Sequence, residues 1–121
     1  MSIEFLFLID FIILFFQPHR WNYFCKTGIK NYYLYGSGSS ADKDKLIIDK
    51  VLPNMKCIGY IDGLKSGFKE DLPIIKADEY NFVENITYII ISSTVAGYDI
   101  YKKLIAVGKR ELTDFIYGGG F

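Results

Sequence analysis

The chain has 121 residues, of which 50% are hydrophobic and 17% aromatic, so it is long enough for one compact domain and too apolar to be intrinsically disordered. Lys plus Arg and Asp plus Glu number 14 residues each, and this balance leaves no overall charge that would attract nucleic acid. The single histidine, His19, and two cysteines without metal-ligand spacing, Cys25 and Cys57, exclude the usual zinc sites.

The N-terminal segment 1–30 differs from the rest of the chain in its hydropathy. Residues 1–16 are apolar apart from one serine and two acids, and Pro18 follows the run. A membrane-spanning helix needs about 20 apolar residues, and a signal peptide needs a basic start and a small-residue cleavage site, so neither is expected. We predict a hydrophobic helix and a connector over residues 1–30.

Three interpretations of this hydrophobic segment remain open. It is a helix that packs against the domain or a second copy of the chain, or a membrane-surface anchor through residues 1–17, or sequence that precedes the true start of the protein. In the membrane interpretation the basic residues Arg20, Lys26 and Lys30 lie at the lipid headgroups. Because so many exposed Phe and Leu side chains would aggregate, we expect them to be covered in a homo-oligomer.

The remaining chain alternates short β-rich runs with helical stretches. Residues 32–35 predict a first strand, and residues 39–52 predict a helix that ends before Pro53. Residues 56–62 are dense in apolar side chains and predict a second, buried strand. The apolar side chains of the helix form one inward-facing stripe: Leu46, Ile47, Val51 and Leu52.

The middle of the chain is predicted to be less regular. Residues 63–71 are typical of a polar loop, and residues 72–75 predict a third strand whose Pro73 suits a sheet edge. Asp78 is expected to cap a short helix that reaches about Val83.

The last third of the chain returns to clear strand and helix patterns. Residues 86–93 are the most hydrophobic run and predict the central strand of the sheet. Residues 96–107 predict a helix that Gly108 ends, residues 114–117 predict a last strand, and residues 118–121 form a Gly-rich tail. The apolar side of this helix carries Ile100, Leu104, Ile105 and Val107.

This alternation of strands and helices predicts an α/β fold in which helices flank a parallel sheet. With right-handed crossovers, the expected architecture over residues 31–117 is a Rossmann-like three-layer domain with about five strands in the order 3-2-1-4-5.

The stretch between the first strand and the first helix carries the clearest binding signal. Residues 36–41 read Gly-Ser-Gly-Ser-Ser-Ala and match the G-x-G-x-x-G/A pattern of phosphate-binding turns. The first glycine permits a tight turn, the second lets a pyrophosphate approach the backbone, and free N–H groups at the helix start attract an anion. The predicted nucleotide-phosphate site consists of Gly36, Ser37, Gly38, Ser39 and Ser40.

Two further groups of residues belong to the predicted site. Asp62 ends the second strand, 21 residues after Ala41, near the position where an acid would bind ribose or sugar hydroxyls. Ser92, Ser93 and Thr94 end the fourth strand, next to the glycine loop at the switch point of the sheet. Their hydroxyls are candidate ligand contacts, or else they cap the helix that follows.

A purely structural interpretation of the glycine loop also stands. Ser39 and Asp42 have capping-box spacing, so the loop would only begin a helix. Asp42 and Asp44 would repel an incoming anion, and Lys43 and Lys45 offset them in part.

The order of these motifs resembles a known group of bacterial proteins. The segments that carry the resemblance are "YLYGSGSSA", "CIGYIDG", "DLPIIKADEY", "ITYIIISS" and "IYKKLIAVG". They look like the N-terminal domain of NeuD/PglD-type sugar acyltransferases. They are also similar to Rossmann-like domains of bacterial polysaccharide nucleotide-sugar epimerase/dehydratases and to domains beside FkbM-type methyltransferases. The resemblance covers roughly residues 31–117.

In the acyltransferases this domain holds the nucleotide-sugar substrate. The resemblance therefore implies that residues 36–39 face the phosphates and that Asp62 faces the sugar or ribose. The chain departs from the family in two ways. Ser39 and Ser40 stand where these enzymes often have Gly-His, and no hexapeptide repeats follow, so acyltransferase activity is not implied.

These observations lead to one preferred function and two alternatives. We expect a cytoplasmic domain of bacterial surface-polysaccharide metabolism that binds a UDP-sugar-like nucleotide and acts with a separate catalytic domain or partner. The alternatives are an NAD(P)-binding oxidoreductase-type domain and a non-catalytic oligomerising or membrane-peripheral scaffold. No set of residues predicts catalysis by itself. Within an enzyme, the expected activity is that of a sugar-modifying transferase or a nucleotide-sugar epimerase/dehydratase.

Overall fold

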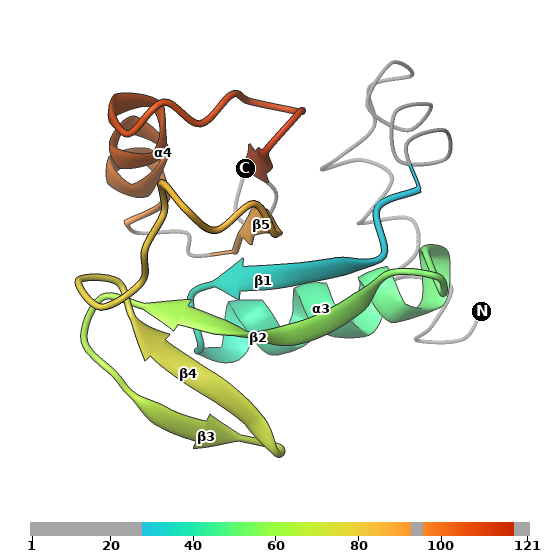
Figure 1. The fold of residues 1–121 in the computed structure, drawn as a ribbon. Coiled ribbons are helices and arrows are strands. Elements are labelled where there is room, and N and C mark those ends of the chain that lie inside the picture. Colours follow the sequence, from blue (N-terminus) through green and yellow to red (C-terminus); the bar gives the residue numbers. More distant parts are fainter. Residues whose placement is uncertain (1–27, 93–95, 118–121) are drawn as a thin grey trace.

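The computed structural model describes residues 28–92 and 96–117 (Figure 1). These residues form an α/β fold with one six-stranded, mostly parallel sheet and two helices. The expected α/β class is therefore confirmed. The hydrophobic helix predicted at the N-terminus, Ser93, Thr94 and the tail at 118–121 lie outside the described residues.

The elements follow one another along the described chain in an order close to the predicted alternation. They are β1 (Asn31–Tyr35), α3 (Ser39–Val51), β2 (Lys56–Asp62), β3 (Gly67–Lys69), β4 (Leu72–Lys76), β5 (Tyr88–Ile91), α4 (Gly97–Ala106) and β6 (Phe115–Tyr117). Neither α3 nor α4 is long and apolar enough to cross a membrane.

The strand order is β3-β4-β2-β1-β5-β6, which differs from the predicted order of five strands. All neighbouring strands pair in parallel except β3 and β4, which form an antiparallel hairpin. Residues 63–71, expected as a polar loop, contain β3. β3 occupies the sheet edge that was expected for the strand with Pro73. The predicted strands lie next to β3 in the order β4-β2-β1-β5-β6.

The extra strand depends on an unusual turn between β3 and β4. Glu70 and Asp71 have φ angles of 50° and 68°, the left-handed conformation that a two-residue hairpin of this kind requires at both positions. Asn-Gly or Asp-Gly is the usual sequence for such a turn. The dipeptide Glu-Asp is not typical of such a turn, so the hairpin could not be predicted from these residues.

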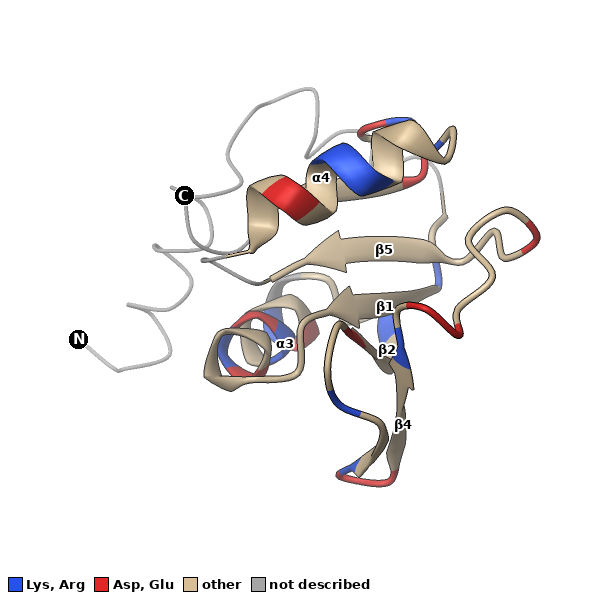
Figure 2. Cartoon of the chain, turned by 90° about the vertical axis from the view of Figure 1, so that its left-hand side faces the viewer, with Lys and Arg blue, Asp and Glu red and all other residues tan. Residues whose placement is uncertain are grey.

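One described helix packs on each face of the sheet, and β1 and β5 lie between α3 and α4 in Figure 2. Because successive strand residues point to opposite faces, Leu34 joins the core under α3 and Tyr35 joins the core under α4. α3 contributes Ala41, Ile47 and Ile48 to the core beneath it, and α4 contributes Ile100 and Leu104 to the other core.

The apolar stripes of the helices differ in part from the predicted ones. Leu46 was expected to face inward but is exposed, and Ile48 is buried instead. Ile105 on α4 and Val107 directly after it are also exposed, whereas Ile100 and Leu104 are buried as predicted. The face of a helix that contacts the sheet holds fewer side chains than the apolar run contains. Packing against the sheet therefore decides which apolar side chains are buried.

The helix expected from Asp78 to about Val83 does not form. The side chain of Asn81 accepts hydrogen bonds from the N–H groups of Val83 and Glu84, each at 3.1 Å, and closes a turn there. Tyr80 and Phe82 both join the core under α4. Residues two apart share one side of an extended chain but not of a helix, so this aromatic packing is incompatible with the predicted helix.

Candidate functional site

The predicted glycine loop connects β1 to α3 at the carboxyl edge of the parallel strands. Gly36 has a φ of 119°, a conformation that glycine adopts without steric cost. Its N–H donates to the carbonyl oxygen of Ile61 at 2.7 Å. This bond extends the pairing of β1 with β2 and ties the start of the loop to β2.

Ser37 and Asp62 bring the two predicted halves of the site together. The Ser37 hydroxyl donates to Oδ2 of Asp62 at 2.6 Å. The other carboxylate oxygen, Oδ1, accepts from the N–H groups of Leu64 at 2.8 Å and Lys65 at 2.9 Å. Asp62 therefore holds the glycine loop and the loop after β2 in one arrangement.

These contacts also set the charge of Asp62. Burial alone would raise the pKa of its carboxyl, but the hydrogen bonds from Ser37, Leu64 and Lys65 lower the pKa overall. The carboxylate is consequently ionised near neutral pH and acts as an acceptor, as a ligand with ribose or sugar hydroxyls would require.

The start of α3 lacks the side-chain cap that is expected if the glycine loop only begins a helix. Gly38, not Ser39, is the N-cap, and no side chain makes a capping hydrogen bond to this end of the helix. Ser39 and Asp42 therefore do not form a capping box. A Cβ added to Gly38 would meet nothing within 4 Å, so open space lies next to the backbone here. An uncapped helix start beside open space is suited to an anion.

The two acids expected to repel an anion are placed differently from each other. Asp42 forms an ion pair with Lys69 of β3, with 2.7 Å between Oδ1 and Nζ. Asp44 is buried within the structure rather than at the loop. Lys45, expected to offset these acids, pairs with Asp49 at 3.1 Å.

Of the remaining predicted contacts, Ser92 directly follows β5. Ser92 is fully buried, and both its N–H and its hydroxyl donate to the carbonyl oxygen of Tyr35, at 3.1 and 3.3 Å. Its hydroxyl thus links β5 to β1. Ser93 and Thr94 lie outside the described residues.

A groove of about 460 Å³ lies next to this loop, on the α4 side of the sheet. Tyr35 and Gly63, which line it, are the direct chain neighbours of Gly36 and Asp62. Burial raises the pKa of Tyr35, and the negative charge of Asp62 raises it further. The lining is mostly apolar, and its other members include Ala77, Phe82, Lys103 and Val107.

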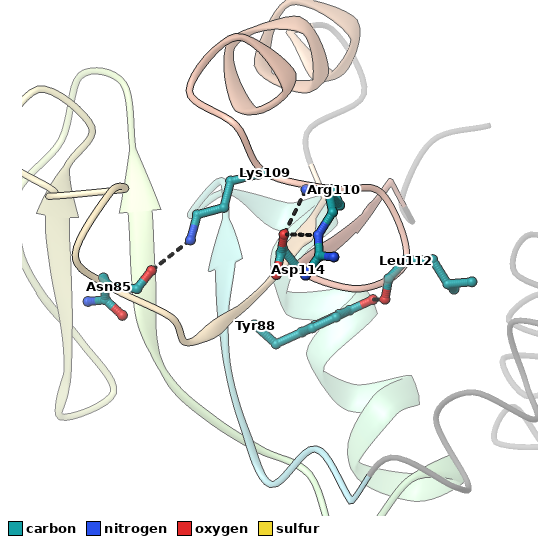
Figure 3. Close-up of polar contacts among 6 residues, drawn as sticks. All are labelled: Asn85, Tyr88, Lys109, Arg110, Leu112 and Asp114. Carbon is teal, nitrogen blue, oxygen red and sulfur yellow. Dashed lines mark hydrogen bonds and ion pairs between the residues drawn. The ribbon is translucent and has the colours of Figure 1, made fainter.

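Polar contacts hold the connection between α4 and β6 in place, as Figure 3 shows. Lys109, after α4, donates from Nζ to the carbonyl oxygen of Asn85 at 2.7 Å. Farther along the same connection, the carbonyl oxygen of Leu112 accepts from the Tyr88 hydroxyl at 2.8 Å. Asp114 accepts from the Arg110 N–H at 2.7 Å. The connection between α4 and β6 is thereby anchored to Asn85, which precedes β5, and to Tyr88, the first residue of β5.

Sequence reasoning missed Lys69 and the groove. Lys69 lies in residues expected as a polar loop, and its approach to the glycine loop depends on the β3–β4 hairpin. The groove is formed by four separate segments, at 35, 63, 77–82 and 103–107, whose proximity is created by folding.

Among residues 28–92 and 96–117, no group of three or more His, Cys, Asp or Glu side chains is arranged to hold a metal ion. The chain matches no protein-family model and shows no significant similarity to a curated protein.

Proposed function

We propose that this protein binds a nucleotide or nucleotide-sugar at the carboxyl edge of its sheet. The observation that carries the proposal is the 2.6 Å hydrogen bond between Ser37 and Asp62, which joins a glycine turn to an ionised acid across two neighbouring parallel strands. In this proposal β1, α3 and β2 act as a Rossmann-like binding unit, and ligands of such sheets bind at this edge.

The phosphates of the ligand bind at residues 36–40. The uncapped start of α3 and the open space at Gly38 support this assignment, because backbone N–H groups can then approach phosphate oxygens. Asp62 accepts hydrogen bonds from ribose or sugar hydroxyls. Its second-strand position and its lowered pKa support this role.

The groove beside Tyr35 accepts the ring of the base. Its volume lies within the range of about 300–1,000 Å³ that is usual for small-molecule sites. Its aromatic and aliphatic lining suits a flat heterocycle, and Lys103 and Asp78 supply polar groups at its wall.

A UDP-sugar-like nucleotide is the preferred ligand, and a role in bacterial surface-polysaccharide metabolism with a separate catalytic partner follows from the motif resemblance. NAD(P) is the second candidate, because an acid after β2 beside a glycine turn also suits a dinucleotide ribose. Both candidates use the same glycine loop, so a ligand screen separates them.

The test measures thermal unfolding with UDP-glucose, UDP-N-acetylglucosamine, NAD(H), S-adenosylmethionine and coenzyme A. A ligand at 100 times its dissociation constant should stabilise the protein by about 2.7 kcal/mol. We expect this response from the UDP-sugars. A response to NAD(H) alone would favour the second candidate, and no response to any compound would contradict nucleotide binding.

Gly38→Asp tests the loop itself. Asp is a better N-cap residue than Gly and there is open space for its side chain, so the variant should fold with equal or slightly higher stability. Its carboxylate should occupy the helix N–H groups and abolish the response to UDP-sugars. Asn54→Val, in the exposed turn between α3 and β2 at the opposite edge of the sheet, is the control and should respond as the wild type does. Retained binding in Gly38→Asp would exclude the loop as the phosphate site.

A further inference from the structure

Lys69 contacts the glycine loop from a strand that was not expected. Its Nζ donates to the backbone carbonyl oxygen of Ser37 at 2.7 Å and forms an ion pair with Asp42 at the same distance. The same ammonium lies 5.6 Å from the centroid of the Tyr60 ring. The Lys69 side chain is 23% exposed, whereas that of Asp42 is 53% exposed, so the cation is the more enclosed partner.

We infer that Lys69 is a positioning residue of the phosphate site: it orients the Ser37–Gly38 peptide and neutralises Asp42. This role rests on the proposed function and deepens it, because it assigns the preorganisation of the phosphate loop to the β3–β4 hairpin.

Peptide geometry fixes the direction of the Gly38 N–H group. The C=O and N–H groups of a trans peptide point in opposite directions, and the described chain has no cis peptide bonds. Because Lys69 holds the carbonyl of Ser37, the N–H of Gly38 must point away from Lys69. Asp62 holds the Ser37 hydroxyl at the same time. The loop is therefore held from two sides before a ligand arrives, which reduces the ordering cost of binding.

Lys69 also changes the charge at the start of α3. Asp42 lies in the first turn of α3, where its negative charge competes with a phosphate for the positive end of the helix dipole. An ammonium 2.7 Å away offsets that charge. Without Lys69, Asp42 would face an incoming phosphate as an unpaired like charge.

The hairpin explains how the lysine reaches this position. β2 and β4 are parallel neighbours, and such strands are usually joined by a helix. Here the chain instead forms β3 and turns at Glu70 and Asp71, directly after Lys69. The register of β3 on β4, with Lys69 opposite Leu72, is thus what presents the ammonium to the loop.

The experiment measures dissociation constants by calorimetry for UDP-glucose, inorganic pyrophosphate and uridine. Lys69→Met keeps the aliphatic stem and should weaken binding of UDP-glucose and pyrophosphate roughly tenfold or more, because the Ser37 carbonyl loses its charged donor and Asp42 loses its ion-pair partner. Uridine has no phosphate and should bind as it does to the wild type. Lys69→Arg should stay within about threefold of the wild type, since the positive charge is retained.

Asp42→Asn supplies a second, independent variant on an exposed side chain. Added to Lys69→Met, it should restore most of the lost pyrophosphate affinity, because the unpaired acid is removed. Lys56→Met removes an exposed lysine from the opposite edge of the sheet and should leave all three constants unchanged.

The outcomes separate the two proposals. If the wild type binds UDP-glucose and Lys69→Met binds it equally well, the role of Lys69 is overturned and the proposed function stands. An equal loss of uridine and pyrophosphate in Lys69→Met would show a purely structural role and also overturn the inference. If the wild type binds neither UDP-glucose nor pyrophosphate, the proposed function itself fails.

Discussion

At the scale of single residues, Asp44 is an acid in an apolar setting. It belongs to the same buried side of α3 as Ala41 and Ile48, and its side chain is only 4% exposed. Within the described part of the chain, its Oδ2 atom has no hydrogen-bond partner. Burial raises the pKa of this carboxyl to about 7, and the charge of Lys43 lowers it only in part. Ionising Asp44 in the folded protein therefore costs free energy.

This shift predicts a stability that falls as the pH rises. The folded-state pKa of about 7 lies above the ordinary value of 3.8, so the contribution of the protonated group is complete below about pH 4 and is lost as the pH approaches 7. Asp44→Asn removes the titration. The difference in unfolding free energy between the variant and the wild type should shift in favour of the variant by on the order of 3 kcal/mol between pH 4 and pH 8. Urea unfolding of both proteins from pH 4 to 8 measures this, and a difference that does not change with pH would contradict it.

At the scale of elements, β2 combines a bulge with a glycine. Tyr32 pairs with Cys57 and Tyr33 with Gly59, so one residue of β2 is left over between them. A Cβ at Gly59 would lie 2.9 Å from Cε1 of Tyr33 and 3.0 Å from the carbonyl oxygen of Pro73. The absent side chain lets β4 and the Tyr33 ring pack against β2.

Gly59→Ala should therefore destabilise the protein by about 1–3 kcal/mol through overpacking. Gly63→Ala is the matched control, because a Cβ there meets nothing within 4 Å. Its effect should remain within about 0.5 kcal/mol. Chemical denaturation of both variants measures the difference, and equal stabilities would show that Gly59 does not need its small size.

The elements also show how far local patterns extend. Helix 39–52 and the strands at 32–35, 56–62 and 72–75 were predicted because their apolar runs and the flanking Gly and Pro are local signals. The hairpin with β3 was not, since Glu70 and Asp71 adopt positive φ values without the usual glycine. The helix expected after Asp78 also failed, because aromatic packing outweighed its local capping signal.

At the scale of the whole molecule, two apolar cores share one sheet. Ile48 lies in the core under α3 and Leu104 in the core under α4, and both side chains are 1% exposed. β1 contributes alternate residues to both cores, Leu34 to one and Tyr35 to the other. Loss of either core would remove support from the same strands, so the described domain should unfold as one unit.

Ile48→Ala and Leu104→Ala test this coupling. Each truncation should lower the free energy of unfolding by about 2–5 kcal/mol. In each variant the far-ultraviolet and tyrosine near-ultraviolet circular dichroism should change in a single coincident transition. Two separate transitions in either variant would show that the cores unfold independently.

The sequence by itself determined the α/β class, most strands, both described helices and the pairing of a glycine turn with an acid at the end of the second strand. These follow from periodicity, from glycine and proline, and from the rule that parallel strands end at one edge. Only the tertiary structure decided the position of Lys69 against the glycine loop, the groove beside Tyr35 and the burial of Asp44. Each of these depends on contacts between distant segments, and their geometry is set by packing and by the hairpin register rather than by any local pattern.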